Sequence, residues 1–529
     1  MKSIRRTEWS RLILILAVLV GAFMRFNPTL LSGFPINDGG MFAVMIEDLK
    51  AHRYLLPEFT SYNDFDIQFV YPPLGFYLGS LASDVFGWSA IETLRWLPPF
   101  FASISILAFY LLAWRLLKND YIASVSTLFF ALMPRAYWWY IMGGGLTRGL
   151  GQLFMLLTLA SLVRLYQENR RSDIFLSGLF GGLAVLSHPE AAVYTLTSAL
   201  FLWTMLSRNR IGFINSIYVA LLVLIVTAPW WGTVIRYHGL APLLSGASTG
   251  QRLAAVFNLF FFTFTEESFA ALIAVLGLIG IAYCLVKKNY LLPLWMLIPF
   301  LVAGRSATGP AAVPLAMLAA IGLVDIIFAA INLSLETGSN PVQADPKEAD
   351  LVPSAERNIL IYVVVFIIVS AYYFGMELSN MVLYPSNKEA MTWVKENTPA
   401  SSRFLVLTGD SSVFCDAVSE WFPALSRRQS LSTIQGTEWT QGPNFANHVW
   451  STLDVQGCLS GGNASCLDKA IDRSAYDYIY FAKVLRGNSN CKAGTEKEFP
   501  YFLEHMKADP NFETVYETED VIVLRKSGS

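Results

Sequence analysis

The sequence predicts an α-helical polytopic membrane protein with a smaller α/β domain at its C-terminal end. Of its 529 residues, 54% are hydrophobic and only 15% are charged, and the mean hydropathy is +0.45. Soluble domains carry about a quarter charged residues, so this composition indicates a chain that places much of its surface in lipid. The net charge of −2 gives no reason to expect a nucleic-acid partner.

Apolar segments recur along the first two thirds of the chain. A helix needs about 20 mostly apolar residues to cross the hydrocarbon core, and by this rule we expect about eleven crossings. They lie at residues 10–29, 95–117, 121–141, 150–167, 173–188, 190–206, 212–235, 267–286, 290–304, 311–331 and 358–379. The apolar piece from Tyr71 to Trp88 begins with two prolines and contains Asp84, so it is predicted as an interfacial helix instead.

The basic residues define the expected orientation, because cytoplasmic loops are enriched in Lys and Arg. With an uncleaved first helix and a cytoplasmic N-terminus, every short inside loop of an eleven-crossing path is basic, from Lys118 to Lys287. The acidic loop 332–357 is kept inside because acidic residues count little in this rule. We therefore expect a transmembrane domain at residues 1–379, with a large first outer loop at 27–94, and an extracytoplasmic domain at 380–529.

The C-terminal region has the pattern of a small α/β domain. Residues 403–408, 476–481 and 521–525 are short apolar runs rich in β-branched and aromatic residues, which predict strands. Residues 411–425 and 499–508 are predicted as helices between them.

Four of the five cysteines lie in this region, namely Cys415, Cys458, Cys466 and Cys491, whereas Cys284 falls in an apolar segment. Four cysteines in one small domain suit up to two disulfides in an oxidising compartment, with three pairings open. Four unrelated thiols are the alternative.

Asp38 is the candidate catalytic base. It lies in the turn Asn37-Asp38-Gly39-Gly40, directly after the first membrane helix and before an amphipathic stretch at residues 41–49. A partly desolvated carboxylate at the membrane surface is suited to accept a proton from an acceptor hydroxyl or amine. A simple turn is the alternative, because Asn, Asp and Gly all favour turns.

Arg148, Arg236 and Arg305 fall near the outer ends of different predicted helices. Arginine at this level either extends to lipid headgroups or, where several converge, binds a phosphate group. We expect these three to hold a donor phosphate. The run Gly143-Gly144-Gly145 just before Arg148 would let a phosphate approach main-chain N–H groups.

Tyr71, His188 and Glu190 are the candidates for binding a substrate. Tyr71 precedes Pro72-Pro73, for which a plain helix start is the alternative. His188-Pro189-Glu190 lies at the apex between two short helices, where a plain hairpin tip is the alternative.

The acidic outer loops leave open whether the protein binds a divalent metal. Asp66, in Asp64-Phe65-Asp66, and Glu266, near the end of the long outer loop, are the candidate ligands. Solvated surface for Asp66 and a helix start for Glu266 are the alternatives.

Taken in order, these motifs resemble the GT-C superfamily of membrane glycosyltransferases, which use polyprenyl-phosphate sugars. The resemblance is to the branch of protein O-mannosyltransferases and the aminoarabinose transferase of lipid A. It rests on Asp38, Tyr71-Pro72-Pro73-Leu74, Arg95, the segments 184–189 (AVLSHP) and 228–231 (APWW), and the outer segment 420–425 (EWFPAL). It departs where Gly39 stands in place of the glutamate that many members carry after the aspartate.

The resemblance implies an inverting glycosyltransferase in which Asp38 activates an extracytoplasmic acceptor (a protein, a lipid or a glycan) toward a polyprenyl-phosphate sugar. The competing hypothesis is a transporter or flippase of lipid-linked sugars with an outer binding domain. Transporters typically show inverted repeats and charged residues at the bilayer midplane, which this sequence does not clearly have. The sugar, the acceptor and the number of phosphates on the donor stay open.

Overall fold

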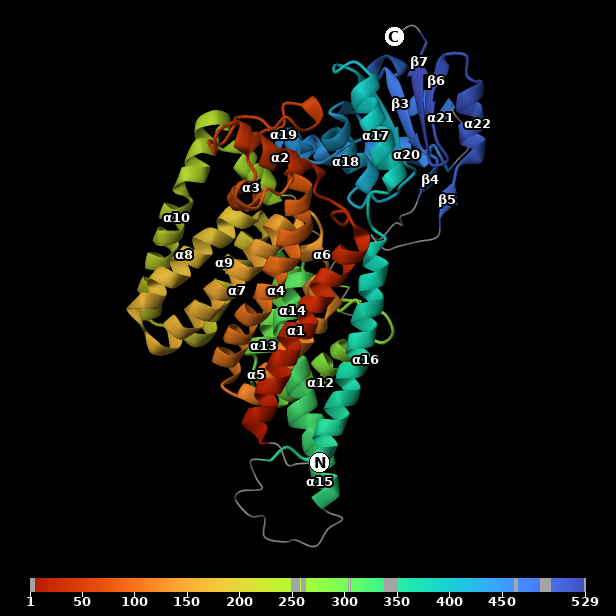
Figure 1. Ribbon diagram of the computed structural model, residues 1–529. Coiled ribbons are helices and arrows are strands. Elements are labelled where there is room, and N and C mark those ends of the chain that lie inside the picture. Colours follow the sequence, from red (N-terminus) through yellow and green to blue (C-terminus); the bar gives the residue numbers. More distant parts are fainter. Residues whose placement is uncertain are drawn as a thin grey trace.

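The computed structural model describes residues 5–248, 257, 263–302, 304, 306–336, 351–460, 465–485 and 496–527. They form a helical body and a smaller α/β domain, which are joined at the end of α16 (Ser354–Ser379) (Figure 1). Two residues singled out above, Arg305 and Cys491, lie outside this part of the chain.

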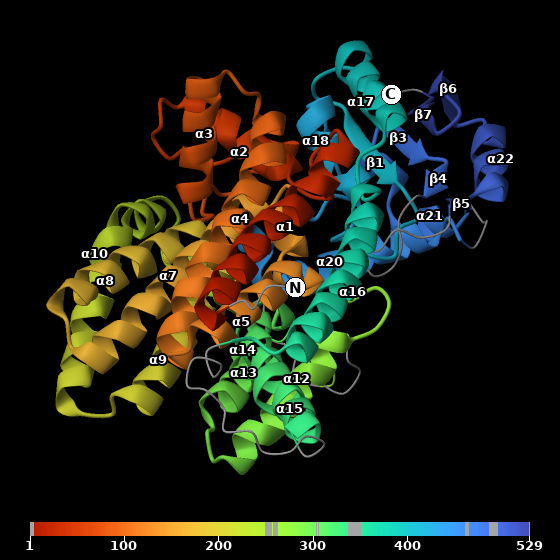
Figure 2. The same cartoon turned by 60° about the horizontal axis from the view of Figure 1, so that its bottom comes forward.

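Six helical segments among the described residues are long and apolar enough to cross a membrane. They are α1 (Arg6–Ser32), α4 (Ala90–Leu117), α7 (Gly145–Glu168), α10 (Arg210–His238), the run Thr308–Ser334, and α16 (Ser354–Ser379). Figure 1 and Figure 2 both show α1 and α16 side by side along the body. The chain is thus a multi-pass membrane protein. Each of the eleven predicted spans contains helix, but eleven is not confirmed as a number of crossings.

Shorter helices complete the body, and several of them are apolar. They are α2 (Gly40–Ala51), η1 (Tyr62–Asp64), α3 (Leu74–Phe86), α5 (Asp120–Leu132), η2 (Pro134–Ala136), α6 (Trp138–Ile141), α8 (Arg171–Ser187), α9 (Pro189–Leu206), α11 (Ala241–Ser248), α12 (Leu272–Val286) and α13 (Leu291–Val302). The run Thr308–Ser334 is built from α14 (Thr308–Ile321), η4 (Gly322–Phe328) and the start of α15 (Ala329–Glu336).

The predicted span 121–141 is broken in the structure. Helix α5 ends at Leu132, and the short helices η2 and α6 follow it. Pro134 explains the break, because proline disfavours the helical conformation for the residue before it. Met133 accordingly has an extended backbone.

Helix α7 occupies the centre of the helical body. It packs against α4, α8 and α9, and most of its residues are buried. It begins at Gly145, so its first turn carries Arg148. The central helix therefore presents this arginine at the end of the body that faces the C-terminal domain.

The C-terminal domain contains a five-stranded sheet in the order β2-β1-β3-β7-β6. Its strands are β1 (Arg403–Leu407), β2 (Gln429–Ser430), β3 (Tyr478–Ala482), β6 (Phe512–Glu517) and β7 (Val521–Lys526), and a separate ribbon pairs β4 (Val484–Leu485) with β5 (Lys497–Glu498). Strands β2, β1 and β3 run parallel, and β7 is antiparallel to both β3 and β6. The three predicted strands are confirmed as β1, β3 and β7.

Helices cover both faces of this sheet (Figure 1). The helices of the C-terminal domain are α17 (Pro385–Asn397), α18 (Ala417–Ser426), α19 (Thr437–Gln441), η5 (Gly442–Asn444), α20 (Phe445–Gly457), α21 (Ser465–Ala470), η6 (Arg473–Ala475) and α22 (Pro500–Ala508). The predicted helix at 411–425 begins later, at Ala417, and the predicted helix at 499–508 is confirmed as α22.

Alternate residues of β1 belong to two different cores, as strand geometry requires. Leu405 and Leu407 pack inside the domain against α20 and α22. Phe404 and Val406 belong to a second core that also contains residues of α2 and α3, from the segment 27–94 that the sequence predicts as the first outer loop. One hydrophobic core therefore joins the C-terminal domain to the helical body.

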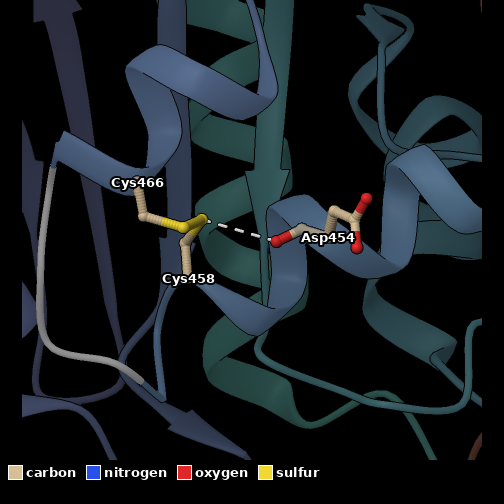
Figure 3. Close-up of a disulfide and its surroundings, with 3 residues drawn as sticks. All are labelled: Asp454, Cys458 and Cys466. Carbon is tan, nitrogen blue, oxygen red and sulfur yellow. Dashed lines mark hydrogen bonds between the residues drawn. A yellow bond between two sulfur atoms is a disulfide. The ribbon is translucent and has the colours of Figure 1, made fainter.

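Cys458 and Cys466 form a disulfide (Figure 3). The Cys458 Sγ atom lies 3.4 Å from the main-chain oxygen of Asp454; this is a contact and not a hydrogen bond, because a disulfide sulfur carries no proton. Cys415 is also disulfide-bonded, and Cys284 is a buried free thiol. These findings agree with the predicted oxidising compartment for the C-terminal domain.

We expect thiol labelling of the unfolded, non-reduced chain to modify Cys284 but neither Cys458 nor Cys466, because a disulfide sulfur does not react with iodoacetamide. Peptide mass spectrometry before and after dithiothreitol measures this directly. A Cys284→Ser variant serves as the control and should lose the label seen without reduction. Labelling of Cys458 before reduction would contradict the pairing.

Candidate functional site

Asp38 lies between α1 and α2, in the loop where the helical body meets the C-terminal domain. Its Oδ1 accepts a hydrogen bond of 2.8 Å from the main-chain N–H of Gly144, and its Oδ2 forms an ion pair with Arg148. The Arg148 guanidinium also donates through Nε to the Trp139 carbonyl over 3.2 Å. The carboxylate is thus fixed by a charge and by the beginning of α7.

The glycine run 143–145 makes this close approach possible. A Cβ atom on Gly143 would lie 1.8 Å from the Asp38 carbonyl oxygen, and one on Gly144 would lie 2.5 Å from Asp38 Oδ2. The sequence predicted that this run would admit a phosphate to main-chain N–H groups. In the structure the Gly144 N–H instead donates its hydrogen bond to the carboxylate of Asp38.

The C-terminal domain contributes two residues of α18 to the same loop. Glu420 accepts a hydrogen bond of 2.7 Å from the Gly39 N–H, and the Trp421 indole N–H donates to the Asn37 carbonyl over 2.9 Å. Burial, together with the negative charge of Asp38, raises the pKa of Glu420 to about 8. Glu420 therefore keeps its proton to a higher pH than an ordinary glutamate does.

A cavity of about 320 Å³ lies next to Arg148, between the helical body and the C-terminal domain. The helical body lines it with Tyr71, Arg135, Trp138, Arg148, Gln152, His188 and Glu190, among others. The C-terminal domain lines it with Phe414, Ile434, Gln435, Glu438, Trp439 and Phe445. Pockets that hold small molecules have volumes of roughly 300–1,000 Å³, so this cavity is large enough for a compact ligand.

Four residues that line this cavity also carry a buried polar atom that has no hydrogen-bond partner within the described part of the chain. These atoms are the indole nitrogens of Trp138 and Trp439 and the side-chain oxygens of Gln152 and Gln435. Buried polar groups are normally paired, and these atoms supply both donors and acceptors. The residues around the cavity therefore hold unused hydrogen-bonding capacity beside a polar lining that includes Arg148, His188 and Glu190.

The structure brings three of the predicted substrate-binding residues together. Tyr71, His188 and Glu190 line the cavity beside Arg148, and the rings of Tyr71 and His188 have centroids 6.0 Å apart. The Tyr71 hydroxyl lies 3.4 Å from the hydroxyl of Thr147, and burial raises its pKa, so it stays protonated. The N–H of Glu190 donates to His188 Nδ1 over 3.2 Å.

Among the described residues, three other candidates do not line the cavity. Arg236 is exposed near the end of α10 and is absent from the cavity lining. Asp66 is exposed in the first outer loop, and Glu266 is paired with Arg135. Among the described residues, no three His, Cys, Asp or Glu side chains gather in a way that would hold a metal ion.

Three residues of the site were not found from the sequence. Arg135 fell within the predicted span 121–141. Pro134 was the signal that this helix breaks, and after the break Arg135 lines the cavity. Glu420 was quoted only within the segment 420–425 that carries the resemblance and was given no role, and Trp439 was not singled out, because their neighbours in the site lie hundreds of positions away in the chain.

Comparison with known proteins agrees with this geometry. A family model described as dolichyl-phosphate-mannose-protein mannosyltransferase matches residues 70–232. The structure of ArnT from Cupriavidus metallidurans bound to undecaprenyl phosphate is similar, with a TM-score of 0.54 and 14% identity over 99% of each chain. The arabinofuranosyltransferase AftD from Mycobacteria gives a TM-score of 0.56 and 14% identity over 100% of this chain and 40% of that one. No curated protein matches the sequence.

These likenesses show that the chain shares the fold of ArnT over its whole length and that of part of AftD. The family model covers residues 70–232, which is less than half of the 529 residues, and the likeness over the whole chain is a likeness of fold. The resemblance expected from the sequence is confirmed for the fold.

We expect the stability of the folded protein to fall as pH rises from about 4.5 to about 8, in part because of Glu420. Burial raises the pKa of Glu420 from 4.5 to about 8, so the folded state keeps a proton that the unfolded state releases. Glu420→Gln removes this titration. The Tm of the wild type should therefore fall relative to the Tm of Glu420→Gln as pH rises across this range. A difference that stays constant with pH would contradict the raised pKa.

Proposed function

We propose that the protein is an integral membrane, inverting glycosyltransferase that moves a sugar from a polyprenyl-phosphate carrier to an extracytoplasmic acceptor. The observation that supports this best is the placement of Asp38 and Arg148. The carboxylate is fixed beside a polar cavity, and the arginine connects it to that cavity.

In the proposed reaction, Asp38 accepts the proton of an acceptor hydroxyl or amine as the acceptor oxygen or nitrogen attacks the anomeric carbon. The bond between the anomeric carbon and the phosphate oxygen breaks, and polyprenyl phosphate leaves with the electron pair. A single displacement of this kind inverts the anomeric centre. General-base catalysis of this type contributes about 10²- to 10⁴-fold to the rate.

Arg148 is proposed to stabilise the leaving phosphate, because preorganised positive charge favours the negative charge that develops there. Arg135 lines the same cavity and is a second candidate for this role. Arg236 and Arg305 remain predictions from the sequence alone. ArnT, which shares the fold, has been solved with undecaprenyl phosphate, and this supports a lipid-phosphate donor.

Tyr71, His188 and Glu190 are proposed to contact the sugar, together with the opposite wall formed by the C-terminal domain. Trp439 stands on that wall with its ring centroid 5.8 Å from that of Tyr71. Aromatic rings with a polar edge combine an apolar surface with a hydrogen-bond donor, which suits a sugar ring.

We expect Asp38→Asn to lower turnover by about 10²-fold or more while donor affinity stays within a few fold, because the variant keeps the shape of the side chain but cannot accept a proton. Release of polyprenyl phosphate from a polyprenyl-phosphate hexose, measured in nanodiscs alongside donor binding, tests this. Asp66→Asn is the matched control, since Asp66 is an exposed aspartate of the same outer loop.

Wild-type protein that binds the lipid but never cleaves it with acceptors from native membranes would contradict the transferase and favour a transporter or flippase. Full turnover by Asp38→Asn would contradict the role of Asp38.

We expect Trp439→Phe to weaken binding of the sugar-bearing lipid by about 5- to 10-fold and to leave binding of bare undecaprenyl phosphate unchanged, because the variant keeps the ring but removes one hydrogen-bond donor. Binding of undecaprenyl phosphate with and without an attached hexose measures the difference. Trp450→Phe, an exposed tryptophan of the same domain, is the control. An equal loss for both lipids would contradict a sugar contact.

A further inference from the structure

The loop from Ile36 to Gly40 is held from two sides. On one side, the start of α7 binds it: the Gly143 N–H donates to the Ile36 carbonyl over 3.0 Å, and the Gly144 N–H donates to Asp38 Oδ1. These contacts belong to the helical body alone. They fix the side chain of Asp38 and the main chain before it.

On the other side, neighbouring residues of α18 bind the two residues that flank Asp38. Trp421 donates to the carbonyl of Asn37, and Glu420 accepts from the N–H of Gly39 over 2.7 Å. The main chain is thus attached to the C-terminal domain immediately before and immediately after Asp38.

This attachment is a tight, buried contact. Glu420 is 6% exposed and Trp421 is fully buried. A Cβ atom on Gly40 would lie 2.5 Å from the carbonyl oxygen of Glu420, so only glycine admits α18 this closely. The Tyr62 hydroxyl, from the first outer loop, donates to the same carbonyl over 2.7 Å.

A carboxyl group at position 420 lowers the stability of the folded protein. Burying it next to the carboxylate of Asp38 brings two acids together, with Arg148 as the cation that faces both. Groups placed at such a cost are concentrated at functional sites.

We infer that Glu420 is a positioning residue for Asp38, and that the active site is complete only when the C-terminal domain is docked on the first outer loop. The inference rests on the proposed function of Asp38. Through the Gly39 N–H, Glu420 sets the direction in which α2 begins, and this fixes where the carboxylate of Asp38 meets the acceptor.

Removing Glu420 should therefore lower turnover more than donor binding. Leaving the Gly39 N–H buried without an acceptor, and letting Asp38 move by a fraction of an ångström, should reduce turnover by roughly 10- to 100-fold. The donor is held mainly by the cavity, so its affinity should change by less than about threefold.

The experiment compares three full-length variants in nanodiscs: Glu420→Ala, Glu420→Gln and, as a control, Glu504→Ala, an exposed glutamate of α22. Glu420→Gln keeps an oxygen that accepts from Gly39 and should restore turnover to within about threefold of wild type. Hydrogen–deuterium exchange of a peptide covering residues 37–46 is measured in parallel. Glu420→Ala should increase exchange there and leave exchange in α17 unchanged.

Two results would overturn the inference. One is turnover and exchange of Glu420→Ala that match those of Glu504→Ala. The other is a loss in Glu420→Gln as large as in Glu420→Ala, accompanied by weaker donor binding and faster exchange in α17, which would mark a merely structural role. If the wild type transfers no sugar to any acceptor, the proposed function fails, and the exchange of residues 37–46 still decides whether Glu420 positions the loop.

Discussion

The ion pair between Asp38 and Arg148 is the interaction on which the rest of the site depends. It joins the loop after the first helix to the first turn of the central helix α7, so it connects the outer loop to the rigid part of the body. The glycine run 143–145 makes the pair possible by removing the side chains that would block it. A carboxylate held this way needs little reorganisation at the moment of reaction, which is what preorganised electrostatics requires.

The second constraint is that the cavity belongs to neither domain alone. The helical body provides Arg148, His188 and Glu190, and the C-terminal domain provides the wall that carries Trp439. The core shared by β1, α18 and α2 keeps the two walls together, since burial of apolar surface is the main stabilising term in such an interface. The geometry of the site therefore depends on how the C-terminal domain docks on the helical body.

Much of this was available from the sequence because it depends on local pattern. Apolar runs predicted the helices of the body, and short β-branched runs predicted β1, β3 and β7. Asp38 and His188 could be singled out because a turn and a proline mark the ends of helices. Strands β2 and β6 were missed, since the first has two residues and the second is half exposed at the sheet edge. Glu420 and Trp439 were missed as site residues because only tertiary packing brings them to the loop and the cavity.

The most direct test of the account is a structure of Asp38→Asn bound to a polyprenyl-phosphate sugar that the wild type turns over. We expect the sugar ring to fill the cavity that Tyr71 and Trp439 line, the phosphate to contact Arg148, and the anomeric carbon to face residue 38. A lipid phosphate bound away from Arg148, with the cavity empty of sugar, would contradict it.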